Sequence, residues 1–288
     1  MCIRDRGVAT EKNVYVPDLM KDEALALIGR NHEKPFFIYY ATNVPHSNNE
    51  ATKIRRADGA EVPDLGDYAD RDWMLGAKRH AAMISRMDSD IGAILQSLED
   101  HGIADNTIVM FTSDNGPHVD HAEPMDFFTP AGPLQGWKMN LWEGGIRVPL
   151  LVRWPGQVAP GTVQETPAYF GDIMATFARL SGQPTPPDTD SSDMLPLLSG
   201  QPGRFETHEF LYWEFRGKDT GIVGLMEGRW KGIIRKNNPG HLELYDLQTD
   251  IAETRDVAAE HPEIARSLRD YMLSERTASE IWSSPLED

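Results

Sequence analysis

Residues 107–113 read Thr-Ile-Val-Met-Phe-Thr-Ser and run directly into Asp114-Asn115-Gly116-Pro117-His118. A short, mostly apolar run that ends at turn residues is typical of a strand buried on both faces, as in a parallel sheet. Two more runs of this kind lie at residues 36–41 (Phe-Phe-Ile-Tyr-Tyr-Ala) and 148–154. The three runs therefore predict three buried strands.

Helical periodicity fills the segments between and beside these strands. Apolar side chains recur at spacings of three and four over residues 72–101, which predicts a long helix. Shorter helices are expected at residues 18–29 and 170–180. The alternation of strands and helices predicts an α/β fold, with a layered, mostly parallel sheet flanked by helices.

The last third of the chain has a different pattern. A proline-rich linker is expected at residues 183–204. Beyond it, Gly or Asn turns separate short predicted strands, and a helix closes the chain, at residues 209–215, 222–226, 230–234, 242–247 and 262–276. We expect a domain of residues 1–204 and a C-terminal subdomain of residues 205–288, the latter a small antiparallel sheet plus one helix.

Composition limits the classes of partner. The 288 residues include 28 Lys and Arg against 45 Asp and Glu, a formal net charge of -17, which disfavours nucleic acid as the main partner. The longest clean apolar run, residues 36–41, is far shorter than the roughly 18 residues of a membrane span. Cys2 is the only cysteine, so no intrachain disulfide and no Cys-based zinc site is expected.

Polar residues follow two of the predicted strands at the point where ligands gather in α/β sheets. The first strand runs into Pro45-His46, and the second into Asp114-Asn115. A carboxylate beside an amide oxygen suits a hard cation such as calcium or magnesium. Taken alone, Asn-Gly is also a good turn signal, and a lone histidine is more often a surface residue.

A further candidate lies between the second and third strands. Lys138 follows Gln135-Gly136-Trp137 and can hold an anionic oxygen, or it can be a solvated side chain in a tight loop. Neither a dinucleotide-binding nor a P-loop fingerprint is present. The polar residues His118, Asp120, His121 and Glu123 can bind a metal or form a surface loop.

These pieces together resemble the sulfatase family in order and spacing. The resemblance rests on the apolar strand with Pro45-His46, on Ser113-Asp114-Asn115-Gly116, on Lys138, and on the run from Glu143 to Pro149 (Glu-Gly-Gly-Ile-Arg-Val-Pro). Residues 244–247, with Glu253-Thr254 and residues 259–262, resemble the C-terminal subdomain of that family, and residues 212–215 are similar to a strand of its bacterial arylsulfatase-like members. The resemblance implies an alkaline-phosphatase-like fold and a sulfuric-ester hydrolase that cleaves aryl or carbohydrate sulfate esters.

The resemblance also implies roles for particular residues. Asp114 and Asn115 match ligands of a divalent cation, usually calcium, with magnesium as an alternative. His46 and Lys138 match residues that contact the sulfate ester, His46 helping to protonate the leaving oxygen and Lys138 stabilising negative charge. His118 is expected to be a further substrate contact. Relatives are often exported, so a periplasmic or secreted location is expected for the full-length protein.

One family feature has no match in this sequence. The family nucleophile is a formylglycine made from Cys or Ser in a C/S-x-P/A-S-R segment, with paired aspartates nearby. Cys2 and Arg6 copy only the outer spacing, because Arg4 and Asp5 stand where Pro and Ser are needed. We therefore expect a partial sulfatase domain without its first strands, nucleophile or half of its metal site, which binds calcium weakly, is poorly soluble and is inactive alone.

Two other functions remain open at this stage. The first is a metal-dependent phosphoester hydrolase of the same superfamily, whose members commonly use two zinc ions. The second is a non-catalytic remnant that binds sulfated glycans, for which Lys53, Arg55 and Arg56 are candidate contacts.

Overall fold

The computed structural model describes residues 3–4, 7–8, 14–48, 59–118, 127–217, 219–281 and 283–286. The candidates Cys2, Lys53, Arg55, Arg56, Asp120, His121 and Glu123 lie outside the described residues. The chain forms two compact units, Met1–Thr107 with Val119–Thr129, and Ile108–His118 with Pro130–Asp288. The division expected at residues 204 and 205 stays a prediction about sequence domains, and it falls inside the second unit.

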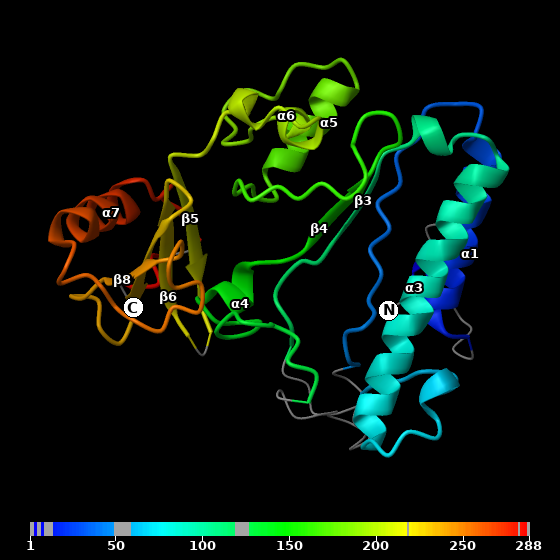
Figure 1. The fold of residues 1–288 in the computed structure, drawn as a ribbon, viewed down its shortest axis with the longest axis horizontal. Coiled ribbons are helices and arrows are strands. Elements are labelled where there is room, and N and C mark those ends of the chain that lie inside the picture. Colours follow the sequence, from blue (N-terminus) through cyan, green and yellow to red (C-terminus); the bar gives the residue numbers. More distant parts are fainter. Residues whose placement is uncertain are drawn as a thin grey trace. The chain divides into compact units, whose positions relative to one another are not determined.

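The first unit is built on two helices, α1 (Val16–Asn31) and the long α3 (Leu75–Asp100), which pack side by side (Figure 1). Both helices were expected from their apolar spacing, within two or three residues of their observed ends. A salt bridge from Arg86 to Asp18 (3.0 Å) joins α3 to α1. The other elements are the short strands β1 (Ile3–Arg4) and β2 (Gly7–Val8) and the 3-10 turns η1 (Gly66–Tyr68) and η2 (Ala104–Asn106).

The strand predicted at residues 36–41 does not form. Residues 35–43 make no strand pairing, and side-chain exposure alternates along them. Phe37 is 72% exposed and Tyr39 84% exposed, whereas residues 36, 38 and 40 are half-buried. The expectation of burial on both faces is therefore wrong. A strand needs a neighbour to satisfy its backbone groups, and no described strand pairs with this segment.

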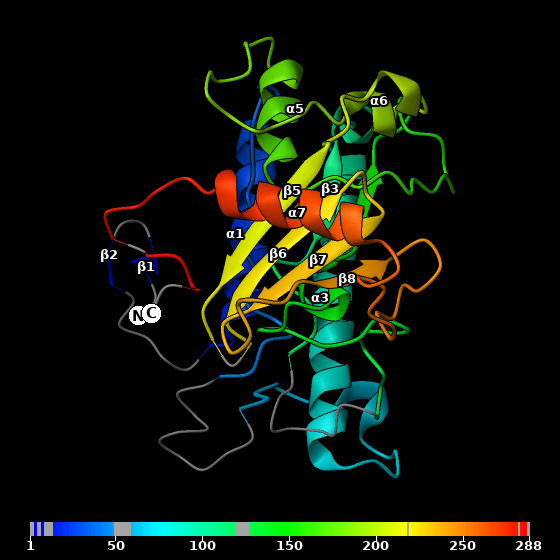
Figure 2. The same ribbon diagram turned by 90° about the vertical axis from the view of Figure 1, so that its left-hand side faces the viewer.

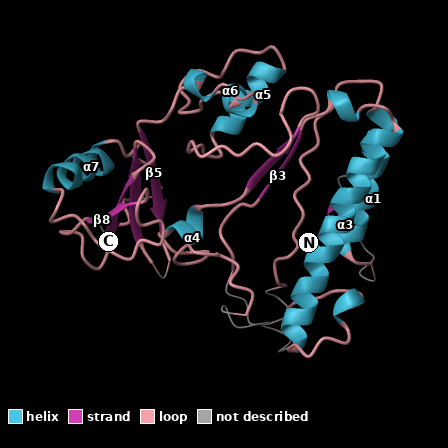
Figure 3. Cartoon of the chain, in the orientation of Figure 1, coloured by secondary structure: helices cyan, strands magenta, loops and turns pink. Residues whose placement is uncertain are grey.

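The second unit begins with two strands, β3 (Val109–Thr112) and β4 (Leu150–Arg153). They pair antiparallel, with Val109 opposite Arg153 and Thr112 opposite Leu150. The parallel pairing expected here is thus absent, and every strand pair among the described residues is antiparallel. Between the two strands, the described residues form loops and the short α4 (Glu143–Ile146) and no crossover helix of the kind that joins parallel strands (Figure 3).

The expected linker is exposed over residues 183–190 but packs against the second unit over residues 191–198. Residues 183–204 contain α6 (Leu195–Leu198) and η3 (Pro202–Arg204), and they follow α5 (Asp172–Leu180). Met194 and Leu197 are buried together with Phe205, against Ile173 of α5. The packed part, residues 191–198, therefore belongs to the core of the second unit.

The C-terminal part of the second unit is the predicted antiparallel sheet with its helix. Strands β5 (Phe210–Phe215), β6 (Gly221–Met226), β7 (Trp230–Arg235) and β8 (Glu243–Asp246) lie in sequence order. Helix α7 (Pro262–Ser274) crosses one face of the sheet (Figure 2). Residues 141–146 cover the opposite face, where Leu141 packs with Val223 and Ile233.

None of the helices in the described part of the chain combines the length and apolar character that crossing a membrane requires.

Asp256 joins β8 to the segment before α7 and makes stability depend on pH. Burial disfavours its charged form, but hydrogen bonds from the N–H groups of Leu244 (3.0 Å) and Ala258 (2.9 Å) and from His241 (2.9 Å) outweigh burial. They hold the pKa of Asp256 below its ordinary value of 3.8.

Asp256→Asn is expected to lower the free energy of unfolding at neutral pH. A carboxylate whose pKa is depressed in the folded state stabilises that state when the pH is above its unfolded-state pKa. This stabilisation is lost as the pH falls through the folded-state pKa. The difference between the two proteins should therefore shrink below a pH of about 3.8. Urea unfolding of both proteins across the acid range measures this difference, and a difference that stays constant down to the lowest pH would contradict the argument.

Candidate functional site

The predicted ligands Asp114 and Asn115 lie in the turn that follows β3. The Ser113 hydroxyl donates to the Asn115 carbonyl (3.0 Å), which closes the turn. Asp114 is exposed and Asn115 half-buried. The Asn115 side-chain nitrogen donates to the Gly116 carbonyl (3.1 Å), which places the amide oxygen on the opposite side of that side chain.

Three backbone segments cross directly behind this turn. The Gly116 N–H donates to the Gly145 carbonyl (3.0 Å), and the Gly144 N–H donates to the Gln135 carbonyl (2.8 Å). A β-carbon built on Gly116 would lie 1.8 Å from the Gly144 carbonyl oxygen, and one on Gly144 would lie 2.3 Å from the Gly136 carbonyl oxygen. The crossing can therefore form only where the side chain is absent. The close approach of these backbones explains why glycine stands at positions 116, 136, 144 and 145.

Lys138 is tied to the same crossing by its backbone. Its N–H donates to the Pro117 carbonyl (2.8 Å), three residues after Asp114 in the turn. The next residue, Met139, has a positive φ of 76°, which turns the chain sharply toward α4. The Lys138 side chain is half-buried. The fold thus holds Lys138 and the Asp114-Asn115 turn on one scaffold within the second unit.

The two candidate histidines belong to different units of the chain. His118 is half-buried and ends the turn after Pro117, in the second unit. His46 is exposed, belongs to the first unit, and its Nδ1 lies 2.7 Å from the Ser47 carbonyl. The structure therefore joins Asp114, Asn115, His118 and Lys138 in one unit, while the catalytic role expected of His46 stays a prediction.

The donor set of the turn suits a hard cation. Asp114 offers a carboxylate and Asn115 an amide oxygen, which are the ligand types that calcium and magnesium prefer. Two protein oxygens are fewer than calcium usually takes, so these residues fit part of a site. Among the described residues, no group of three or more His, Cys, Asp or Glu side chains converges in a metal-binding arrangement.

A buried charge cluster that the sequence analysis missed lies next to the glycine crossing and contacts it through Glu143, the residue before Gly144. Lys231 of β7 is fully buried, and its ammonium lies 2.9 Å from Glu143 and 2.7 Å from Glu253. The Glu143 N–H donates to the second oxygen of Glu253 (2.6 Å). Burial raises the pKa of Glu253, although Lys231 and this N–H group oppose the shift. The available signal was a lone lysine inside the apolar strand Trp230-Lys231-Gly232-Ile233-Ile234.

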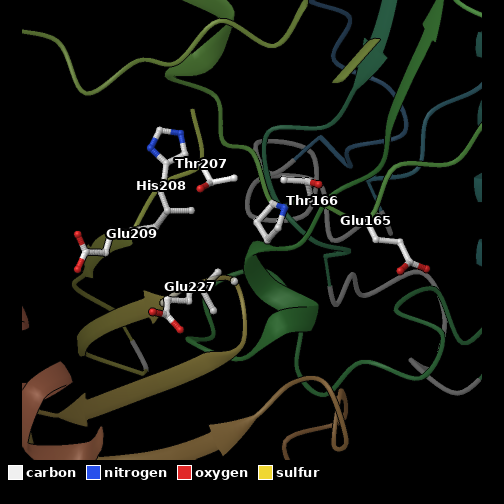
Figure 4. Close-up of a pocket in the computed structure, with 10 residues that line it drawn as sticks. Glu165, Thr166, Thr207, His208, Glu209 and Glu227 are labelled. Atoms are coloured by element: carbon white, nitrogen blue, oxygen red, sulfur yellow. The ribbon is translucent and has the colours of Figure 1, made fainter. Parts of the chain in front are cut away.

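The second unit also has a polar cavity of about 510 Å³ away from these residues (Figure 4). His208, on its wall, pairs with the fully buried Asp172 (2.9 Å), which anchors the start of α5. The lining contains none of the residues predicted from the sequence; it consists of Glu165, Thr166, Pro167, Thr207, His208, Glu209, Leu211, Leu225, Glu227 and Gly228.

Comparison with protein families matches nearly the whole chain. The family model described as Sulfatase matches residues 6–183, and the model described as N-sulphoglucosamine sulphohydrolase, C-terminal, matches residues 136–278. The two matches overlap over residues 136–183, which contain Lys138 and the Glu143–Ile146 helix.

Comparison with individual proteins gives relatives of the same kind. The N-acetylgalactosamine-6-O-sulfatase of Bacteroides thetaiotaomicron is 31% identical over 92% of this chain and 52% of its own length. Human arylsulfatase A is 26% identical over 93% of this chain and 52% of its own length. A solved structure from work on glycosaminoglycan metabolism by Bacteroides thetaiotaomicron has a TM-score of 0.67 and 28% identity, over 92% of this chain and 55% of that one.

Two conclusions follow from these comparisons. The α/β fold expected from the sequence, with its small antiparallel C-terminal sheet, is confirmed by the solved structure. The chain spans about half the length of these relatives.

Proposed function

Because the chain belongs to the sulfatase family, we propose that its second unit forms part of the active site of a sulfuric-ester hydrolase. The observation that carries the proposal is the glycine crossing, which ties the Asp114-Asn115 turn and Lys138 together through the bonds Gly116 N–H to Gly145 and Lys138 N–H to Pro117. A carboxylate, an amide oxygen and an ammonium on one rigid scaffold suit a singly charged anion bound together with a cation.

The chemistry of a sulfate ester matches these groups. Cleavage builds negative charge on the bridging oxygen and leaves charge spread over the remaining oxygens, so positive groups aimed at them lower the barrier. Lys138 would bind one sulfate oxygen as a point charge. His46 and His118 would contact the ester, with His46 donating a proton to the leaving oxygen.

A divalent cation would be held by Asp114 and Asn115. Calcium is the first choice, with magnesium as the alternative, because both oxygens are hard ligands. When bound, such a cation supplies charge stabilisation to the sulfate oxygens.

The relatives support a proposal for the substrate class. One of them is named for a sulfated amino sugar, and the solved structure comes from work on glycosaminoglycans. We therefore propose a carbohydrate sulfate ester as substrate, with aryl sulfates as surrogates in assays. A periplasmic or secreted location fits such a substrate.

These 288 residues do not contain a C/S-x-P/A-S-R segment, so they supply no formylglycine. We propose that these 288 residues bind the cation and the sulfate ester but do not hydrolyse the ester. Incubation with a chromogenic aryl sulfate is expected to give no product above the uncatalysed rate, and sustained turnover by the purified chain would overturn this part of the proposal.

The cation site is tested by calorimetric titration with calcium. The chain is expected to bind one calcium ion weakly, with a Kd on the order of 10⁻⁴ to 10⁻³ M, because few protein oxygens are present. Asp114→Asn should remove saturable binding. Asp270→Asn, which makes the same charge change at an exposed position on α7, should leave it unchanged.

Three results would count against the calcium site. Equal affinities in the two variants would place the cation elsewhere, and no binding by the unchanged chain would remove it. Tighter binding of two zinc ions than of one calcium ion would favour a phosphoester hydrolase.

A further inference from the structure

Lys231 occupies an unusual place for a lysine. It lies in β7 on the same face as Ile233, because side chains alternate along a strand, and that face packs on residues 141–146. Lys231 has no exposed surface, and Glu143 and Glu253 are 6% and 2% exposed. Arg147, bonded to Glu143 at 3.3 Å, balances the second carboxylate. Buried ion clusters of this kind contribute little net stability compared with apolar residues of the same volume.

Glu253 is also held in a costly conformation. Its φ is 54°, in the left-handed region that residues with a side chain rarely adopt. In this conformation one carboxylate oxygen accepts the Glu143 N–H (2.6 Å) while the other faces Lys231 (2.7 Å). Gln135, with its amide nitrogen turned toward them, donates to the carbonyls of Ala252 (3.0 Å) and Glu253 (3.2 Å). Strain that the surroundings hold in place often marks a functional position.

The contacts of the cluster lead to the crossing behind the Asp114-Asn115 turn. Glu253 accepts the backbone N–H of Glu143, the first residue of α4, and the next two residues of that helix are Gly144 and Gly145. Gly145 accepts the bond from Gly116, and Gly144 donates to Gln135.

Neighbouring contacts secure the same segment. Asp219 accepts the Leu141 N–H (3.1 Å) and pairs with Arg235, whose guanidinium lies 4.5 Å from the Trp142 ring centre.

We propose that Lys231 and Glu253 are positioning residues, which set the Gly144-Gly145 segment and through it the Asp114-Asn115 turn and Lys138. Neither residue touches substrate in this scheme. The inference rests on the proposed function for the relevance of the turn, but its structural core concerns the bonds at Gly116 and Lys138 and stands apart from any metal or substrate. The C-terminal sheet is thereby part of the site's framework.

Amide hydrogen exchange, followed by NMR on the full 288-residue chain, tests this inference. Glu253→Leu removes the acceptor of the Glu143 N–H, so exchange at the Gly116 and Lys138 amides should accelerate at least about 10-fold. Glu253→Gln keeps an oxygen acceptor and should retain wild-type protection. The amide of Val223, inside β6 and bonded within the sheet, reports global opening and should not change.

A second variant keeps the test decisive if Glu253→Leu folds poorly. Lys231→Met combined with Glu253→Leu removes opposite charges together, which is often neutral for stability, yet it still removes the acceptor. This double variant should show wild-type exchange at Val223 and the same acceleration at Gly116 and Lys138.

The outcomes separate this inference from the proposed function. Wild-type protection at both amides in the double variant, or equal acceleration at Val223, would overturn the positioning role. Failure of both variants to fold would do the same, because the cluster would then act on the stability of the whole unit. Absence of calcium binding by the unchanged chain would instead overturn the cation site and leave the exchange result intact.

Discussion

Gly116→Ala is expected to destabilise the second unit by at least about 3 kcal/mol, the largest effect of any single methyl group that we expect in this chain. The new β-carbon would lie 1.8 Å from the Gly144 oxygen, 2.8 Å from its carbonyl carbon and 3.0 Å from the Gly145 α-carbon. All three are backbone atoms, so no side-chain rotation can relieve the overlap. Either the Gly116–Gly145 hydrogen bond breaks or the α4 segment leaves its place on the sheet.

The measurement is urea unfolding followed by tryptophan fluorescence, with Gly203→Ala as the matched control. Gly203 lies in the same unit and has no heavy atom within 4 Å of its added β-carbon, so the control should change the midpoint little. Coincident midpoints for the two variants would show that the crossing is not closely packed.

Leu268→Ala is expected to cost about 2–5 kcal/mol, since it removes a fully buried side chain from the contact between α7 and the sheet. The close approach of α7 depends on Gly224 and Gly232, which lie opposite each other on β6 and β7. A β-carbon on Gly232 would lie 2.7 Å from Leu268, and one on Gly224 would lie 2.6 Å from Met272. The helix therefore fills the space that these two glycines leave, and a cavity there cannot close by inward movement of the sheet.

Leu273→Ala is the control for this prediction. Leu273 is on the same helix but is 50% exposed, so its truncation should cost well under half as much. Thermal and urea unfolding of the two variants measure the difference. Similar losses from both would mean that α7 does not pack on the sheet through Leu268.

The site and the C-terminal sheet are physically continuous, which bears on how the family is built. The two family models overlap over the residues that contain Lys138 and α4. Within this overlap, residues 141–146 cover one face of the sheet, and Gly144 and Gly145 bond to the segments around the turn after β3. If Lys231 and Glu253 act as proposed above, a change in the C-terminal sheet alters the turn without touching it.

The candidate site shows where prediction from residue pattern ends. Asp114, Asn115 and Lys138 were found because they stand next to turn signals and match a family pattern. The burial of Lys231 and Glu253 was missed, since their shared partner Glu143 lies 88 and 110 residues away from them along the chain. Glu253 sits in a polar stretch that gives no sign of burial. Only the packed structure shows that these three charges face one another.

The same division holds for the fold. Helix α3 was predictable because its apolar side chains recur at spacings of three and four. Strands β5 to β8 were predictable because Gly and Asn turns separate short apolar runs. Neither signal needs a distant partner to be recognised. The strand expected at residues 36–41 and the parallel pairing of β3 failed, since an apolar run states only that a segment can be buried. Whether residues 36–41 pair with another strand, and whether β4 runs with or against β3, depends on contacts between segments far apart in the chain. Local sequence does not encode those contacts.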